Sequence, residues 1–233
     1  MPHFDTIAFD ADDTLWHSER YYAQTQTEFV KLLAHYRDEE YTRAHLYEVE
    51  SRNIQHFGYG VKGFALSMIE SAVELTDGLV SGNDIKAIIA LAREMLDADI
   101  ELLNGVGETI ATLAQSHRLM VITKGDLLDQ EKKIQRSGLG KYFYSIEIVS
   151  EKTRETYARL LAEHAIEPPR FFMVGNSLRS DILPILGLGG SAAYVPYEIT
   201  WQHETAEPPV SQPGFYQLGH VGQLPALLEQ LER

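Results

Sequence analysis

The feature of this sequence that most restricts its fold is a change of periodicity near residue 104. Beyond it, short apolar segments typical of buried strands alternate with helical segments, which predicts βαβ units and a parallel sheet covered on both faces. The predicted strands span residues 119–123, 146–149, 171–174 and 192–195. The predicted helices between them span residues 108–115, 129–137 and 156–164. We therefore expect a doubly wound α/β core.

The first 104 residues have a different pattern. The run Thr6–Phe9 is short and apolar, as a buried strand would be, but the next hundred residues contain no convincing strand. One helix is predicted over residues 61–75, and another has its apolar residues on one face from Ile85 to Leu96, with Ser81 as a start signal. The simplest arrangement is a Rossmann-like core of residues 1–15 and 101–233, interrupted by an all-α helical insert of residues 16–100.

Composition narrows the class of protein further. The 233 residues are enough for one large domain, or for a core domain with an insert. The formal net charge of −14 disfavours a nucleic-acid partner. The apolar runs are too short for a membrane span, and we read no signal peptide at the amino terminus. The chain has no cysteine, which excludes disulfides, thiolate metal sites and cysteine nucleophiles. We expect a cytoplasmic protein whose tail beyond Pro196 is a loop, a weak strand at 215–218 and a final helix from about residue 224.

Polar residues follow most of the predicted strands. Ligands of open parallel sheets bind outside the carboxyl ends of the strands, so residues distant in sequence are expected to meet there. The candidates, in chain order, are Asp10, Asp12, Asp13, Thr123, Lys124, Gly125, Lys152, Gly175, Asn176, Ser177 and Asp181.

The most specific of these segments is Asp10-Ala11-Asp12-Asp13-Thr14. Two carboxylates at a spacing of two, on a chain leaving a strand, can point into one site without sharing one proton. One can attack a substrate while the other donates or accepts a proton. The alternative is an acidic turn or a helix N-cap, where aspartate and threonine are common.

The segments after the second and third strands carry groups suited to phosphate. The hydroxyl of Thr123 and the backbone N–H groups of the turn at Lys124 and Gly125 can hold phosphate oxygens. Lys152 can neutralise a phosphoryl group or clustered carboxylates as a point charge. The alternatives are a helix cap for Thr123 and a solvated surface position for Lys152.

The segment from Gly175 to Asp181 follows a strongly apolar strand. The side-chain oxygens of Asn176 and Asp181 suit a hard cation such as Mg²⁺. The alternative is a Gly-Asn turn in which Asp181 caps the helix that follows.

Taken in this order, the four segments resemble the haloacid dehalogenase superfamily of hydrolases, over residues 1–15 and about 101–200. Asp10, Asp12 and Thr14 match the first motif of that family, Asp-x-Asp-x-Thr. Thr123 matches its second motif and Lys152 its third. Gly175 and Asp181 match the fourth, in which Asn176 stands where aspartate is usual. The helical block resembles the smaller α-helical cap of the family.

The resemblance implies a mechanism. Asp10 would attack a phosphoryl group and form an aspartyl-phosphate, and Asp12 would serve as general acid and then as general base. Mg²⁺ would be held by Asp10, the backbone carbonyl of Asp12, and Asn176 or Asp181. Charge on the transferring oxygens would be stabilised by Thr123, the N–H groups of Lys124 and Gly125, and Lys152. For Asp13 we expect a turn or hydrogen-bonding role.

The presence of Asp12 selects among the chemistries of that family. Dehalogenases attack carbon and need no leaving-group acid at this position, and phosphonatases replace it with a small residue. We therefore expect a Mg²⁺-dependent phosphomonoester hydrolase acting on a small phosphorylated metabolite. The alternatives are a phosphomutase on the same core and a non-catalytic ligand-binding or regulatory module.

The substrate and the oligomeric state stay open at this stage. Nucleotides, sugar phosphates, phosphoglycolate-like acids and cofactor phosphates all remain candidate substrates. Specificity is expected to come from the cap, either from the turn at residues 56–63 or from the aromatic residues around Trp16, His17, Tyr21 and Tyr22. Lys62 and Arg52 are either partners for a second anionic group or solvated surface residues.

Overall fold

The computed structural model describes residues 4–199, 201, 204 and 206–232. Two of the sequence-based expectations fall partly outside these residues. One is the absence of a signal peptide, which concerns residues 1–3, and the other is the loop beyond Pro196. The described chain divides into two compact units. The core unit contains the residues up to Glu19, Ile100–Lys124 and the chain from Gln130 onward. The helical unit contains Arg20–Asp99 and, in addition, Gly125–Asp129.

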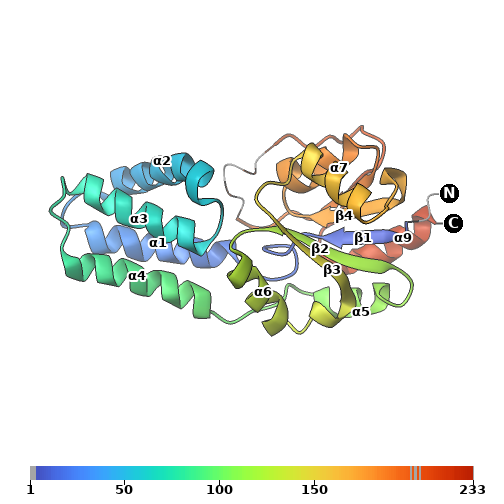
Figure 1. Ribbon diagram of the computed structural model, residues 1–233, viewed down its shortest axis with the longest axis horizontal. Coiled ribbons are helices and arrows are strands. Elements are labelled where there is room, and N and C mark those ends of the chain that lie inside the picture. The colour runs from blue at the N-terminus through green and yellow to red at the C-terminus, as the bar shows by residue number, and fades with distance from the viewer. Residues whose placement is uncertain (1–3, 200, 202–203, 205, 233) are drawn as a thin grey trace. The chain divides into compact units, whose positions relative to one another are not determined.

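The core unit is built on one parallel sheet, as the sequence predicted. Within the described residues its strands are β1 (Thr6–Phe9), β2 (Arg118–Lys124), β3 (Phe143–Val149), β4 (Phe171–Gly175), β5 (Ser191–Tyr194) and β6 (Phe215–Gln217). Their order across the sheet is β3-β2-β1-β4-β5-β6, and every neighbouring pair is parallel (Figure 1). The chain leaves β1 in both directions across this sheet, which is the doubly wound arrangement.

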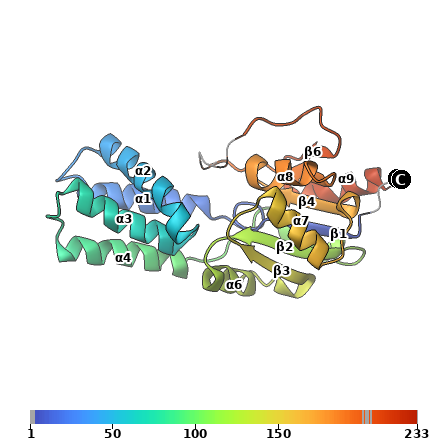
Figure 2. The same cartoon turned by 45° about the horizontal axis from the view of Figure 1, so that its top comes forward.

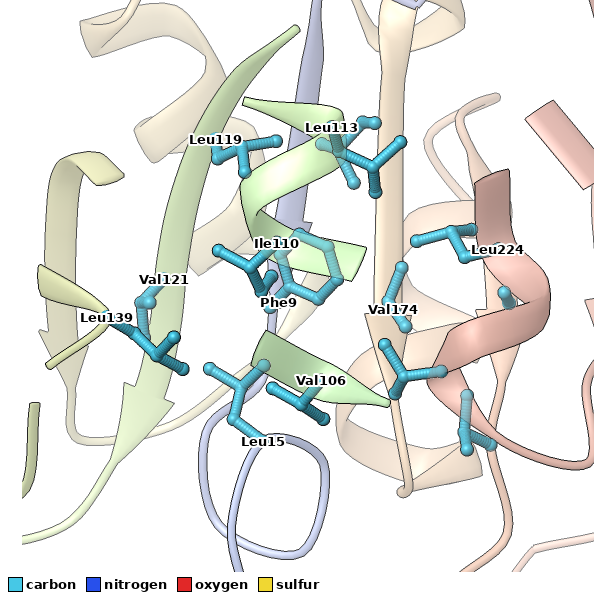
Figure 3. Packing of buried hydrophobic residues seen from close by; sticks show 14 of the residues in the cluster. Phe9, Leu15, Val106, Ile110, Leu113, Leu119, Val121, Leu139, Val174 and Leu224 are labelled. Carbon is cyan, nitrogen blue, oxygen red and sulfur yellow. The ribbon is translucent and has the colours of Figure 1, made fainter. Parts of the chain in front are cut away.

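Both faces of the sheet are buried. Successive side chains of a strand point to opposite faces, so Ile7 and Phe9 join one apolar cluster while Ala8 joins another. The first cluster contains residues of α5 (Val106–Leu113), α6 (Leu127–Arg136) and α9 (Leu224–Leu231), and Figure 3 shows Phe9 packed among Val106 and Ile110. The second contains residues of α7 (Arg154–Glu163), of the π-helical turn Leu178–Ile182 and of α8 (Leu183–Leu186). Figure 2 shows the ribbons of α7 and α8 beside the strands of the sheet. The strands therefore end in a rigid edge that can fix polar side chains.

The helical unit contains α1 (Glu19–Leu33, from Arg20 onward), α2 (Glu39–Phe57), α3 (Val61–Leu75) and α4 (Gly82–Asp97) around an apolar cluster of its own. The expectation of an all-α insert is thus confirmed. Two of these helices are capped by their own N-cap side chains: Asp38 accepts from the Tyr41 N–H, and Ser81 accepts from the Asp84 N–H. Capping of this kind satisfies backbone donors at the first helical turn. None of the helices in the described ranges combines the length and the apolar composition that a bilayer span requires.

The start of α3 is capped by a residue that is distant in sequence. Its own N-cap, Gly60, has no side chain and a φ of 116°. Asp126 supplies the missing acceptor, because its Oδ2 lies 3.1 Å from the Lys62 N–H. A Cβ at Gly60 would lie 2.8 Å from the same Oδ2, so glycine is needed both for the backbone conformation and for this approach.

The two cationic side chains considered for an anionic substrate have carboxylate partners inside the helical unit. The ammonium of Lys62 lies 3.4 Å from Asp126 Oδ1. The guanidinium of Arg52 pairs with Glu70 and Glu74. Both cationic side chains lie at the surface, which favours the interpretation of Lys62 and Arg52 as surface residues.

Candidate active site

The site begins where β1 ends. Asp10 follows Phe9 directly, and its N–H donates to the Val174 carbonyl of β4 at 2.9 Å, so the sheet pairing extends to the residue itself. Its side chain is buried. Thr14, one turn further on, donates its hydroxyl to Asp10 Oδ2 at 3.0 Å. Asp10 is therefore held by backbone on one side and by a hydroxyl on the other.

A buried ammonium joins two of the predicted site carboxylates. Lys152, between the end of β3 and the Thr153 N-cap of α7, donates to Asp10 Oδ1 and, at 2.7 Å, to Asp181 Oδ1. All three side chains are at least 90% buried. The sequence left a solvated position for Lys152 as the alternative, and burial excludes it.

Burial and these charges shift the pKa values of the group. Burial raises the pKa of Asp10 to about 7, against the opposing attraction of Lys152. Burial acts to lower the pKa of Lys152, but Asp10 and Asp181 outweigh it and raise that pKa above its ordinary value. Lys152 is therefore charged and compensates two buried carboxyl groups at once.

The fourth predicted segment reaches the same point. Thr14 Oγ1 lies 3.2 Å from Asn176 Oδ1 as well as close to Asp10, so one hydroxyl brings these two oxygens together. Asp181 Oδ2 accepts from the Ser177 N–H at 3.0 Å. The side-chain cap of the π-helical turn is Ser177, which accepts from the Ser180 N–H. The structure therefore does not support the alternative in which Asp181 serves as the helix cap.

Asp12 points to a different set of partners. Its Oδ1 accepts from Trp16 Nε1 at 2.8 Å and from Lys133 Nζ at 3.1 Å. Its Oδ2 accepts from Gln130 Nε2 at 2.7 Å and from Lys133 Nζ at 3.3 Å. Burial acts to raise the pKa of Asp12, but Lys133, Gln130 and Trp16 outweigh it and hold the pKa below its ordinary value. Asp12 is thus an ionised carboxylate in this structure.

The turn after β2 has its side chains engaged within the protein. Thr123 is buried, and its hydroxyl donates to the Lys124 carbonyl at 3.2 Å. The ammonium of Lys124 donates to Ser180 Oγ at 3.1 Å and pairs with Glu204. Burial acts to raise the pKa of Glu204, but Lys124 outweighs it and the pKa falls to about 2. The ammonium of Lys124 is thus engaged within the protein.

Asp13 has the hydrogen-bonding role that we expected. Its carboxylate accepts from the backbone N–H groups of Ser18 and Glu19, at the start of α1. Its φ is 62°, in the left-handed region that aspartate tolerates better than most residues. Asp13 therefore shapes the turn that carries Asp10 and Asp12.

Two of the four aromatic residues considered for specificity, Trp16 and His17, lie in the core unit. Trp16 is fully buried, and its indole N–H is bonded to Asp12. His17 Nδ1 lies 2.6 Å from the Tyr197 hydroxyl. Of the other two, Tyr22 packs on Phe64 inside the helical unit, with the ring centroids 5.2 Å apart. The packing of Tyr22 on Phe64 is a structural contact of the kind that aromatic residues at helical spacing usually make.

Three site residues were not anticipated. Gln130 and Lys133 stand three residues apart on α6, and Glu204 lies in the loop after β5. The spacing of Gln130 and Lys133 places both on one helix face. This shared face was the feature of the sequence that could have linked the two residues. Nothing in the sequence around Glu204 marks it.

Gly175 is required by the packing of Asp181. A Cβ at position 175 would lie 2.2 Å from Asp181 Oδ2 and 2.3 Å from its Cγ. The Asp181 carboxylate therefore occupies the space that any other residue would fill. Because Asp181 is bonded to Lys152 and to the Ser177 N–H, it cannot move away without breaking those bonds.

We expect Gly175→Ala to lower hydrolytic activity at least about tenfold and the free energy of unfolding by about 1–3 kcal/mol, the range of overpacked cores. Steady-state assays and urea denaturation measure the two effects. Gly82→Ala is the matched control, because nothing lies within 4 Å of a Cβ placed there. Normal activity and stability of Gly175→Ala would show that Asp181 is not held as described.

The family of this chain follows from comparison of its sequence with known protein families. The profile of the haloacid dehalogenase-like hydrolases matches residues 4–189, which include every site residue described above except Glu204. The chain belongs to the haloacid dehalogenase-like hydrolase family. The resemblance stated from the four segments is thereby confirmed.

Relatives within and around this haloacid dehalogenase-like family cover nearly the whole chain. A family hydrolase from Xanthomonas campestris superimposes with a TM-score of 0.88 at 41% identity, covering 98% of this chain and 91% of that one. The N-acylneuraminate-9-phosphatase of Mus musculus is 25% identical over 97% of this chain and 94% of its own length. The Bacillus subtilis hydrolase YfnB, solved bound to magnesium, has the same fold, with a TM-score of 0.69 at 16% identity over 97% of this chain and 99% of that one.

Proposed function

We propose that this hydrolase cleaves phosphomonoesters of a small metabolite through an aspartyl-phosphate at Asp10. The observation that carries the proposal is the pair of carboxylates at positions 10 and 12, each held by its own cation. Lys152 pairs with Asp10 and Lys133 with Asp12. The two carboxylates thus have separate environments, which is what a nucleophile and a proton-transfer group require.

The first step transfers the phosphoryl group to the protein. An Asp10 carboxylate oxygen attacks phosphorus in line, the bond from phosphorus to the ester oxygen breaks, and Asp12 donates a proton to the departing alkoxide. The incoming phosphoryl group adds negative charge near Asp12, which raises its pKa toward the protonated state that donation requires. Lys152, the Thr123 hydroxyl and the N–H groups of the turn that follows stabilise the transferring oxygens.

The second step releases phosphate. Asp12, now ionised, takes a proton from a water molecule whose oxygen attacks phosphorus. The bond between phosphorus and Asp10 breaks, and the carboxylate is regenerated. The donor contacts to Asp12 favour the ionised form needed here. Asp12 thereby ends this step protonated, which is the state that donation to the next ester requires.

The oxygens of the site fit a magnesium ion. Among the described residues, no group of three or more His, Cys, Asp or Glu side chains is arranged as a metal site. A cation here would therefore need other oxygens, and Asn176 Oδ1 supplies one, close to Asp10 through Thr14. Asp10, the Asp12 carbonyl, Asn176 and Asp181 would hold it. When bound, Mg²⁺ offsets the repulsion between Asp10 and the phosphoryl oxygens.

The substrate class is a small phosphate ester. The relatives named N-acylneuraminate-9-phosphatase make an acidic sugar phosphate one reasonable member of the class, at an identity too low to select it. Nucleotides, other sugar phosphates, phosphoglycolate and phosphorylated cofactors belong in the same test. The purified protein is assayed for phosphate release from such a panel, with Mg²⁺ and with EDTA.

Turnover of at least one ester that requires Mg²⁺ is the expected result. Equal rates of turnover with Mg²⁺ and with EDTA would contradict the proposed requirement for a metal ion. Absence of phosphate release, together with halide release from 2-haloacids, would assign a dehalogenase instead. Binding of an ester without hydrolysis would favour the non-catalytic module.

Replacing Asn176 with aspartate is expected to strengthen magnesium binding. A carboxylate adds charge where the amide offers only a neutral oxygen, so half-maximal activation should need several-fold less Mg²⁺. The rise in Tm on adding Mg²⁺ should also be larger at a fixed concentration, since a ligand that binds the folded state stabilises it. An unchanged Mg²⁺ dependence in both measurements would place the ion away from Asn176.

A further inference from the structure

Among the described residues, the hydrogen-bond partners of the Asp12 side chain are three donor side chains. Trp16 and Lys133 donate to Oδ1, and Gln130 and Lys133 donate to Oδ2. Both donors on α6 are themselves enclosed: Gln130 is 2% exposed and the side chain of Lys133 is 12% exposed. The family motif that carries Asp10 and Asp12 does not include either residue of α6.

The amide of Gln130 is oriented unambiguously. Its Nε2 donates to Asp12 Oδ2 at 2.7 Å and to the Lys124 carbonyl at 3.0 Å. The reversed amide would place Oε1 against these two acceptors, which excludes it. In the observed orientation Oε1 is buried and has no hydrogen-bond partner among the described residues.

An unpaired buried acceptor costs about 1–3 kcal/mol. The two hydrogen bonds that Nε2 donates offset this cost. Its two hydrogen bonds join the proton-transfer carboxylate to the backbone of the turn that follows Thr123. The same amide thus fixes Asp12 relative to the phosphate-binding turn.

Lys133 completes this arrangement from the next turn of α6. Residues three apart on a helix share a face, so both donors reach Asp12 from one rigid element. Lys133 contacts both carboxylate oxygens, at 3.1 and 3.3 Å. The carboxylate plane of Asp12 is therefore fixed by contacts on each oxygen.

We propose that Gln130 and Lys133 are positioning residues that hold the Asp12 carboxylate in line with the leaving oxygen of the ester. This inference rests on the proposed phosphatase function and adds residues that set its proton-transfer step. The proton moves from Asp12 to the leaving alkoxide oxygen as the phosphorus–oxygen bond breaks. The role of Gln130 and Lys133 is to keep the donor at that oxygen.

The dependence of the rate on the leaving group tests this role. An alkyl phosphate needs the proton, whereas 2,4-dinitrophenyl phosphate releases a stable anion without it. For Gln130→Met and Lys133→Met we expect kcat/KM for the alkyl ester to fall at least about tenfold, part of the ~10²–10⁴-fold that positioned proton transfer supplies. The value for the dinitrophenyl ester should stay within about twofold. Lys133→Arg should recover most of the alkyl-ester activity.

Lys132→Met is the matched control, because Lys132 is exposed on the same helix. Equal losses on both esters would mean that α6 only supports the fold, and no loss on either would mean that Asp12 needs no positioning. Either result overturns the inference. If the wild type hydrolyses neither ester, the proposed function itself fails. If Asp12→Asn shows the leaving-group dependence and the α6 variants do not, only the positioning role fails.

Discussion

Replacing Asp10 with asparagine is expected to reduce phosphate-ester hydrolysis at least about 10³-fold, since a nucleophile removed from a covalent mechanism leaves only binding and electrostatic contributions. Asparagine keeps the shape of the side chain and an oxygen that can accept a hydrogen bond from Lys152 or Thr14. The loss should therefore appear in kcat, with a folded protein by circular dichroism.

Asp77→Asn is the matched control for this substitution. Asp77 is exposed, its φ is 53°, and asparagine adopts that conformation readily. The control should have wild-type activity. If Asp10→Asn retained more than about a tenth of the wild-type rate, Asp10 would not be the nucleophile.

Replacing Lys152 with methionine is expected to lower the free energy of unfolding by about 3–5 kcal/mol, the range for removal of one partner of a buried ion pair. The ammonium lies between two buried carboxyl groups, and methionine leaves both without a cation. Activity should be lost as well, because the attacking oxygen of Asp10 loses its charged partner. Urea denaturation measures the stability and phosphate release measures the activity.

A double-mutant cycle separates this charge effect from lost packing. In the Asp10→Asn background, one of the two carboxylates is already neutral, so Lys152→Met should cost less than it does in the wild type. Equal costs in both backgrounds would show that Lys152 acts through packing alone. Lys132→Met serves again as the exposed control and should change neither quantity.

The sequence predicted the core well because the sheet is buried on both faces. Short apolar runs such as Phe171–Val174 are typical of strands that are buried on both faces, and the polar residues that follow them stand out. The residues around Asp10 and Asp181 could therefore be assigned to one edge of the sheet from their positions alone. In the structure, both carboxylates accept a hydrogen bond from the ammonium of Lys152.

The edge strand β3 was harder to predict. We placed the third strand at residues 146–149, whereas β3 begins at Phe143. β3 lies at the end of the sheet with one neighbour, and Tyr144 and Ile146 are partly exposed. An edge strand has no continuous apolar signal, because solvent reaches part of it.

The contacts to Asp12 could not be predicted from the sequence. Gln130 and Lys133 lie 118 and 121 residues from it along the chain. Only the packing of α6 against the core decides that these side chains, rather than others on the helix, face the first motif. For the same reason the pairing of Lys124 with Glu204 appears only in three dimensions.

Chemical trapping of the intermediate tests the central claim most directly. Protein mixed with a turning-over ester is quenched and treated with borohydride, which reduces an aspartyl-phosphate to homoserine, and peptides are analysed by mass spectrometry. We predict homoserine at position 10 only when substrate is present. With 2,4-dinitrophenyl phosphate, whose leaving group needs no proton, Asp12→Asn should give more of it, because its intermediate lacks the general base. Turnover with aspartate intact at position 10 in both proteins, or with homoserine at another position, would contradict the account.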